Sequence, residues 1–149
     1  MAHIEQIPSY LTWKIRHKAL YPDSDFKKAI LENDDEGMHL GLFDENQLRS
    51  VVSLFKDGTS LQFRKFATLP DFQNKGYGSE LLAYLLGVAA AENYARVWCN
   101  ARTTASGFYQ RFGFRETDQT FSALNVNYVI MEKISEDNTT GGNSPNIRV

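Results

Sequence analysis

The hydrophobic periodicity of the chain changes at Gly76, and this change limits the folds open to it. Before Gly76, apolar residues alternate with polar ones in several segments, which predicts strands. After Gly76 they recur with a period of 3.6 residues, which predicts one helix with a broad apolar face over residues 79–93. The sequence therefore predicts a strand that leads through the glycine-containing segment "QNKGYG" into a long helix.

The other elements follow from the same two periods and from the turn residues between them. Strands are expected at residues 2–7, 37–44, 48–55, 60–69, 95–100 and 125–134, and further helices at residues 9–21 and 103–112. In the strand at residues 60–69, we expect Leu61, Phe63 and Ala67 on one face. This order predicts the α+β class, with one mixed, mostly antiparallel sheet flanked by helices and a parallel crossover around the long helix.

A single domain over residues 1–134 accounts for all of these elements, and 149 residues suffice for one hydrophobic core. Residues 135–149 read "SEDNTTGGNSPNIRV" and contain little that a core would bury. We expect this segment to be a disordered tail.

Composition excludes several classes of function. The net charge of −2 argues against a non-specific nucleic-acid binder, which normally has a basic excess. No apolar run approaches the roughly 20 residues of a membrane span, and Glu5 and Pro8 interrupt the segment where a signal peptide would be apolar. The single cysteine, Cys99, allows no internal disulfide, and no metal-ligand spacing is present. We expect a cytoplasmic protein without a metal, nucleic-acid partner or membrane partner.

The segment "QNKGYG" has features of an anion site. Amides at the start of a helix have no partner within the helix, and the helix dipole favours negative charge there. Lys75 adds a positive charge. The spacing of a P-loop is absent, and Leu81 stands where a Rossmann loop has its third glycine. From spacing alone, a phosphate site and a plain helix start remain equally open.

Together with a second segment, this loop resembles that of GNAT-superfamily N-acetyltransferases. Members carry Gln/Arg-x-x-Gly-x-Gly/Ala after the fourth strand, which "QNKGYG" at residues 73–78 matches. They also carry an aromatic-rich "FYxxxGF" after an alanine, which Ala105 and "FYQRFGF" at residues 108–114 match. The resemblance covers residues from about 5 to 134, and it implies the family's fold, with the sheet splayed near the cofactor.

The resemblance implies acetyl-CoA as co-substrate. Its diphosphate would lie over the loop and the first turn of the long helix. Its pantetheine arm would run beside the end of the strand at residues 60–69, and a backbone N–H near Ala67 or Thr68 would polarise the thioester carbonyl. The implied cofactor-binding residues are Phe66, Ala67, Thr68, Gln73, Asn74, Lys75, Gly76, Tyr77, Gly78, Ser79, Asn100 and Arg102.

Arg102 departs from the family pattern, because many members have asparagine at this position, seven residues before the tyrosine. Arg102 therefore has two open roles, as a contact to a CoA phosphate or to an anionic acceptor. Asn100 would hydrogen-bond either pantetheine or acceptor. Arg64 and Lys65 would face either an anionic acceptor group or solvent.

Tyr109 matches the family position whose hydroxyl approaches the CoA sulfur, so we expect it to be the general acid. The alternative is a core aromatic residue. His39 is the best candidate for the base by residue type, with a satisfied strand histidine or a water relay as alternatives. The acidic residues Glu32, Asp34 and Asp35 would either attract a cationic amine or form a solvated loop.

These residues predict an N-acetyltransferase that moves an acetyl group to a primary amine of an unidentified small-molecule or protein acceptor. The alternatives are a non-catalytic acyl-CoA-binding module of the same fold and a nucleotide-binding protein. An exposed sheet edge, or the aromatic segment at residues 119–128, offers a surface for a homodimer, although the sequence sets no oligomeric state.

Overall fold

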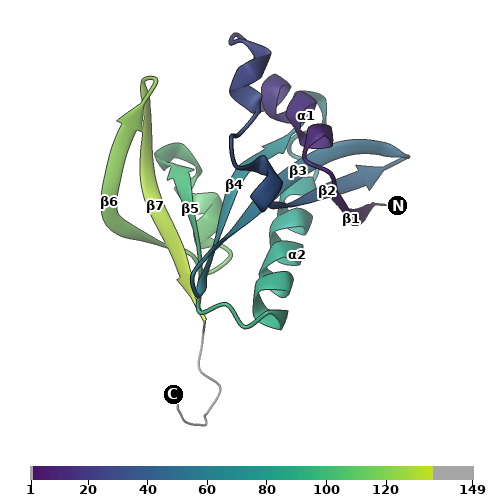
Figure 1. The fold of residues 1–149 in the computed structure, drawn as a ribbon. Coiled ribbons are helices and arrows are strands. Elements are labelled where there is room, and N and C mark those ends of the chain that lie inside the picture. The colour runs from purple at the N-terminus through teal and green to yellow at the C-terminus, as the bar shows by residue number, and fades with distance from the viewer. Residues whose placement is uncertain (1, 136–149) are drawn as a thin grey trace.

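The computed structural model describes residues 2–135, and within them seven strands form one sheet in the order β1-β2-β3-β4-β5-β7-β6 (Figure 1). Every neighbouring pair is antiparallel except β4 and β5. The predicted α+β class with a mixed, mostly antiparallel sheet is confirmed. The strands are β1 (His3–Ile7), β2 (Met38–Asp44), β3 (Gln47–Asp57), β4 (Ser60–Thr68), β5 (Arg96–Arg102), β6 (Arg115–Ala123) and β7 (Val126–Ile134).

Three α-helices and four short 3-10 segments connect the strands of the described chain. They are α1 (Tyr10–Leu20), η1 (Phe26–Ala29), η2 (Asp34–Glu36), η3 (Pro70–Phe72), α2 (Tyr77–Ala91), η4 (Thr103–Ala105) and α3 (Ser106–Gln110). The long helix α2 begins two residues before its predicted start. Apart from Ser135, the predicted tail lies outside the described residues. No helix within residues 2–135 has the length and hydropathy needed to cross a membrane.

The helices α1 and α2 cover opposite faces of the sheet. Val51 packs in one cluster with Ile15 of α1, whereas its neighbour Val52 packs in another with Leu81 of α2. Consecutive residues of a strand point to opposite faces, so the two clusters lie on either side of β3. Burial of both faces at the centre of the sheet holds the two helices in fixed positions.

A β-bulge interrupts β4. Ser53 pairs with Arg64 and Val51 pairs with Ala67, so β4 has one more residue than β3 over this interval. Lys65 lies in the extra segment with a φ of 55°. The added residue shifts every later side chain to the other face, so Ala67 packs on the α1 side. The prediction that Ala67 shares a face with Leu61 and Phe63 is therefore wrong.

The two parallel strands at the centre of the sheet separate after a short contact. Only Ser60, Leu61 and Gln62 of β4 pair with β5, opposite Arg96, Val97 and Trp98. Beyond this point β4 and β5 diverge, as Figure 1 shows. This gap is the splay that the family resemblance implied.

The strand β6 was not predicted. Its side chains are almost all exposed, and it pairs within the described sheet only with β7. An edge strand with both faces open to water carries no apolar alternation, so the periodicity of the sequence gives no signal for it.

Candidate active site

The loop before α2 is shaped to bind an anion. Asn74 and Gly76 both have positive φ, 63° and 86°, and Gly76 is the N-cap of the helix. Where left-handed and right-handed residues alternate along the backbone, successive N–H groups point into one concave surface. The first amide to bond within the helix is that of Glu80, which donates to the Gly76 carbonyl at 3.1 Å. The amides of the preceding turn have no acceptor in the helix and lie at the positive end of its dipole.

A cavity of about 360 Å³, here named the loop cavity, lies against these amides. Its lining includes one cation that was not predicted, Arg111, and no acidic residue of the described chain. The lining residues are Thr68, Phe72, Gln73, Asn74, Gly76, Tyr77, Gly78, Ser79, Phe108 and Arg111.

Tyr77 fixes the start of α2 through its side chain. Its hydroxyl donates to Asp44 Oδ2 at 2.6 Å and accepts from Arg49 Nη1 at 2.7 Å. The hydrogen bond to Asp44 raises the pKa of Tyr77, so the hydroxyl stays protonated at neutral pH. The Arg49 guanidinium also lies 4.1 Å from the centroid of the Phe72 ring. These contacts tie both ends of the loop to the β2–β3 hairpin.

A second cavity of about 540 Å³, here named the splay cavity, lies in the gap between β4 and β5. It shares Gln73 with the loop cavity, so the two adjoin. Its lining residues are Ala19, Leu20, Tyr21, Phe63, Arg64, Lys65, Phe66, Gln73, Cys99, Asn100, Arg102, Ala105, Tyr109, Phe121 and Tyr128.

Tyr109 reaches the splay cavity from α3. Its ring packs against Phe63 and Phe114, with centroids 5.7 and 6.0 Å away. Burial raises the pKa of Tyr109, and its hydroxyl makes no hydrogen bond to the described residues. Because Tyr109 lines the splay cavity, its protonated phenol is a candidate hydrogen-bond donor for a ligand there.

Cys99 also lines the splay cavity, yet it is only 2% exposed. Burial raises the pKa of the Cys99 thiol to about 12. Because the thiolate is the reactive form, this cysteine is poorly suited to accept an acetyl group.

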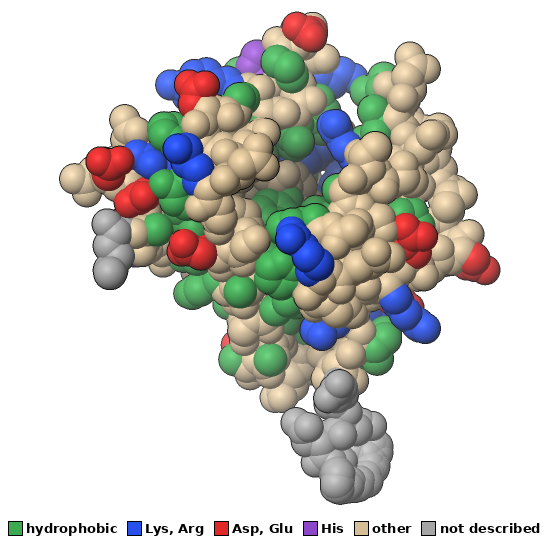
Figure 2. Space-filling view, turned by 180° about the vertical axis from the view of Figure 1, so that it is seen from behind, with side chains coloured by type: hydrophobic (Ala, Val, Ile, Leu, Met, Phe, Trp, Pro, Cys, Tyr) green, Lys and Arg blue, Asp and Glu red, His purple; other side chains and the backbone are tan. Residues whose placement is uncertain are grey.

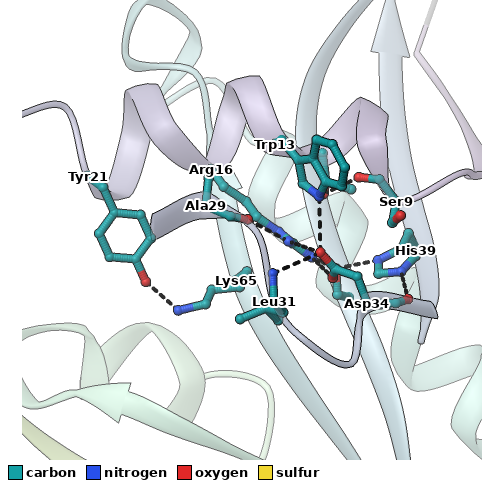
Figure 3. Close-up of polar contacts among 11 residues, drawn as sticks. Ser9, Trp13, Arg16, Tyr21, Ala29, Leu31, Asp34, His39 and Lys65 are labelled. Atoms are coloured by element: carbon teal, nitrogen blue, oxygen red, sulfur yellow. Dashed lines mark hydrogen bonds and ion pairs between the residues drawn. The ribbon is translucent and has the colours of Figure 1, made fainter. Parts of the chain in front are cut away.

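His39 lies in the core and lines neither cavity (Figure 3). Its Nε2 is 2.8 Å from the Asp34 carbonyl and its Nδ1 is 2.7 Å from Ser53 Oγ. A carbonyl only accepts, so Nε2 carries the proton and Nδ1 accepts from the Ser53 hydroxyl. We therefore correct the prediction that His39 is the base, because the alternative of a satisfied strand histidine describes it. Its side chain is turned to the α1 side of the sheet, where both ring nitrogens have partners.

The neighbouring Asp34 is buried in an ion pair with Arg16, rather than in a solvated loop (Figure 3). Arg16 donates to both carboxylate oxygens at 2.9 and 3.0 Å, and Trp13 Nε1 and the Leu31 amide each donate at 3.0 Å. Burial by itself raises the pKa of Asp34, but these hydrogen bonds, that of Arg16 first, lower it below its ordinary value. The Nη2 of Arg16 that donates to Asp34 Oδ1 also donates to Ser53 Oγ at 2.7 Å. The network holds α1 and the segment after it against β3.

The splay cavity is cationic. Arg64, Lys65 and Arg102 line it, and its lining includes no Asp or Glu among residues 2–135. Lys65 Nζ donates to the hydroxyl of Tyr21, just after the end of α1. Figure 2, seen from the side opposite to Figure 1, shows a hollow with Lys and Arg side chains in it and beside it.

The structure brings most of the predicted site residues together. Phe66, Thr68, Gln73, Asn74, Gly76, Tyr77, Gly78, Ser79, Asn100, Arg102 and Tyr109 line one or both cavities. Ala67, Lys75 and His39 line neither. The bulge turns Ala67 to the opposite face, and Lys75 is exposed on the loop.

Other lining residues were missed by sequence reasoning. Arg111 stands two residues after Tyr109 within the quoted motif, so its position could have been noticed there. Phe121 and Tyr128 belong to the β6–β7 hairpin, whose rings stack at 5.1 Å. Since the sequence gives no sign of β6, it could not place these rings beside the splay. Among residues 2–135, no group of three or more His, Cys, Asp or Glu is arranged to hold a metal ion.

Comparisons with known proteins point to one family. A family model described as an acetyltransferase (GNAT) domain matches residues 12–135. YitI of Bacillus subtilis (strain 168), an uncharacterised N-acetyltransferase, is 27% identical over 143 residues, which cover 89% of this chain and 96% of YitI.

Two solved structures show the likeness of fold. An acyl-CoA N-acyltransferase from Pseudomonas aeruginosa is 14% identical with a TM-score of 0.74, and the match covers 89% of this chain and 99% of that one. A GNAT family acetyltransferase from Elizabethkingia anophelis, solved with acetyl-CoA bound, is 18% identical with a TM-score of 0.68, covering 90% and 98%.

Proposed function

Because the chain belongs to the GNAT acetyltransferase family, we propose that it transfers the acetyl group of acetyl-CoA to a primary amine of a small molecule or a protein. The observation that carries this proposal is the adjoining pair of cavities. One lies against the free amides at the start of α2, and Tyr109 lines the other. In an acyl-CoA substrate, the diphosphate would need the amides of the loop cavity, and the thioester would need a hydrogen-bond donor in the adjoining splay cavity.

The residues of the loop cavity fit a diphosphate. The positive φ of Gly76 orients the backbone, and a Cβ added there would meet no atom within 4 Å. The amides of the first turn and Arg111 would bind the phosphate oxygens. Phe66 and Phe108, near Gly78, would pack against the pantetheine arm where it passes towards the splay.

Two groups of the splay cavity would act on the thioester. The bulge leaves Lys65 and Phe66 without partners in the described ladders to β3 and β5, so an amide there would donate to the carbonyl oxygen as negative charge develops. This position replaces the predicted donor near Ala67 or Thr68. Tyr109 would donate its proton towards the departing sulfur, a thiol whose ordinary pKa is about 8.5.

The amine must lose a proton, and neither cavity offers a carboxylate or an imidazole from the described chain for this step. We propose that water takes the proton. The same observation favours a second candidate, a non-catalytic acyl-CoA-binding module of the same fold. The buried thiol of the single cysteine fits the reducing cytoplasm, where we propose that the protein acts.

Release of free CoA thiol in the presence of a panel of amines separates the two candidates. We expect the wild type to release thiol only when an amine is present. We expect Tyr109→Phe to lower kcat by roughly a hundredfold, because general acid catalysis typically contributes this much or more. The melting temperature of the variant, with and without acetyl-CoA, checks that folding and binding are retained.

An equal rate for Tyr109→Phe and the wild type would contradict the role of the hydroxyl. Binding of acetyl-CoA with no thiol release for any amine would instead support the non-catalytic module.

A further inference from the structure

The positive charge of the splay cavity is concentrated on one side of the sheet. The Arg64 guanidinium lies 5.8 Å from the centroid of the Phe55 ring, which in turn contacts the ring of His39. Lys65 donates to the hydroxyl of Tyr21, next to the end of α1. Both cations of β4 therefore lie on the α1 side of the sheet, and α2, with the start that borders the loop cavity, lies on the other side.

This cationic group has no acidic partner within the described chain. No ion pair joins Arg64, Lys65 or Arg102 to an acidic residue among residues 2–135. Although the chain as a whole has a net charge of −2, three of its 16 Lys and Arg side chains line this cavity, with no Asp or Glu of the described chain in the lining. A cleft lined by one sign of charge attracts ligands of the other sign.

The acidic residues that were considered as attractants for a cationic amine do not offset this charge. Asp34 is committed to Arg16, and neither Glu32 nor Asp35 lines a cavity. A bare amine or a polycation would enter this cavity as a cation and be repelled. An acceptor with an anionic group would be attracted, while its amine is presented at the thioester in the neutral form.

We propose that the acceptor is a small molecule with an anionic group, a carboxylate or a phosphate, beside its primary amine, and that Arg64, Lys65 and Arg102 bind this group. The inference rests on the proposed acetyltransferase function. The diphosphate of CoA does not need these cations, since the loop cavity supplies amides and Arg111 on the other side of the sheet.

Matched amines that differ only in the anion test the proposal. The pairs are β-alanine with propylamine, an amino acid with its carboxamide, and phosphoethanolamine with ethanolamine, with putrescine as a dication. Rates are measured at saturating acetyl-CoA and corrected for the fraction of neutral amine. We expect kcat/KM for the anionic member of at least one pair to exceed that of its neutral partner by roughly tenfold or more. Which pair responds distinguishes a carboxylate from a phosphate.

Single substitutions then assign the binding group. Arg64→Gln, Lys65→Gln and Arg102→Gln should each reduce the preference for the anionic member by roughly tenfold, mainly through KM for the acceptor. KM for acetyl-CoA should stay unchanged. Lys56→Gln is the matched control, because Lys56 is exposed and lines neither cavity.

Three outcomes overturn the proposal while the acetyltransferase function stands: equal rates within every pair, a preference for putrescine, or acetyl-CoA binding without acetylation of any anionic amine while a neutral amine reacts. A chain that is not stabilised by acetyl-CoA overturns the proposed function itself. Melting temperatures of the variants with acetyl-CoA distinguish a lost acceptor contact from a lost fold.

Discussion

Asp34, Arg16 and His39 belong to one buried polar network, whose hydrogen bonds set which group donates and which accepts. Asp34 is an acceptor only, Arg16 is a donor only, and Ser53 accepts from Arg16 while it donates to His39. Removal of one member of such a network leaves a buried neighbour without its hydrogen-bond partner. Residues that by type are candidates for acid–base chemistry are in this way committed to holding α1 on the sheet.

Replacing Asp34 by asparagine should lower the free energy of unfolding by about 3–5 kcal/mol at neutral pH, because the Arg16 charge is left buried without its counter-ion. The pKa of Asp34 is lower in the folded state than its ordinary value of 3.8. The charged carboxylate of Asp34 therefore contributes fully to the free energy of unfolding above about pH 4, and this contribution is lost as the pH falls through the folded pKa. Urea unfolding at a series of pH values measures both effects.

Asp35→Asn is the control for this change, since Asp35 is exposed on the neighbouring position. We expect it to alter stability by less than about 0.5 kcal/mol. A similar loss in both variants, or a loss for Asp34→Asn that does not shrink in acid, would show that the buried ion pair is not the cause.

Tyr109 should leave a signature in the pH dependence of the reaction. Burial raises its pKa, so its hydroxyl stays protonated up to and beyond its ordinary pKa of 10. We expect kcat/KM to rise with pH as the amine loses its proton, and to show no descending limb below about pH 10 from loss of the phenol proton. The profile is measured with one amine for wild type and Tyr109→Phe. A descending limb near neutrality that disappears in the variant would mean that the phenol titrates much lower.

At the scale of elements, the site depends on two departures from regular backbone. The bulge at Lys65 interrupts the pairing of β4 with β3 beside the gap between β4 and β5, and the left-handed N-cap at Gly76 opens the amides of α2. Both residues lie in the wall of a cavity: Lys65 lines the splay cavity and Gly76 lines the loop cavity. Of the two glycines, Gly76 and Gly78, only Gly76 has a positive φ, so alanine substitutions should change the stability of the fold differently.

Gly76→Ala should lower the free energy of unfolding by about 1–2 kcal/mol, because its φ of 86° is unfavourable for any residue with a Cβ. Gly78→Ala is the matched change inside the helix. Its Cβ would meet the Phe66 ring at 3.7 Å, an ordinary contact, and alanine favours a helix over glycine by about 1 kcal/mol. We expect Gly78→Ala to be as stable as the wild type or more so, by thermal unfolding of the free protein. The reverse order would contradict the backbone strain assigned to Gly76.

The sequence predicted the elements whose side chains repeat with a clear period. Helix α2 and its loop could be placed because Leu81, Leu82 and Leu85 follow a period of 3.6 directly after two glycines. The bulge could not be predicted, because lysine is an uncommon residue at positive φ and nothing in "QFRKFAT" marks it. The consequence for the site was the misplaced Ala67.

The partners of His39 and Asp34 could not be predicted from the sequence either, although a satisfied strand histidine was among the alternatives for His39. Their hydrogen bonds come from α1, 18 residues before Asp34, and from β3, 14 residues after His39. Local periodicity places a residue on a face of its own element, but the partner on that face is set by the packing of the whole sheet. The loop cavity is readable because most of its lining is continuous in sequence, whereas the lining of the splay cavity is assembled from α1, β4, β5 and the β6–β7 hairpin.

At the scale of the whole molecule, the sheet is divided where its two central strands separate. β1 to β4 with α1 and α2 lie on one side of the gap, and β5 to β7 with α3 lie on the other (Figure 1). The walls of the splay cavity come from both parts. A ligand that fills the gap would contact both, so its binding should stabilise the fold as a whole.

Thermal unfolding with acetyl-CoA therefore tests the proposed site most directly. A ligand at a hundredfold excess over its Kd stabilises the folded state by about 2.7 kcal/mol, which for a chain of this length raises Tm by several degrees. We predict such an increase with acetyl-CoA and a much smaller one with ATP at equal concentration. No change in Tm with acetyl-CoA, or an equal increase with ATP, would contradict the assignment of the two cavities to an acyl-CoA substrate.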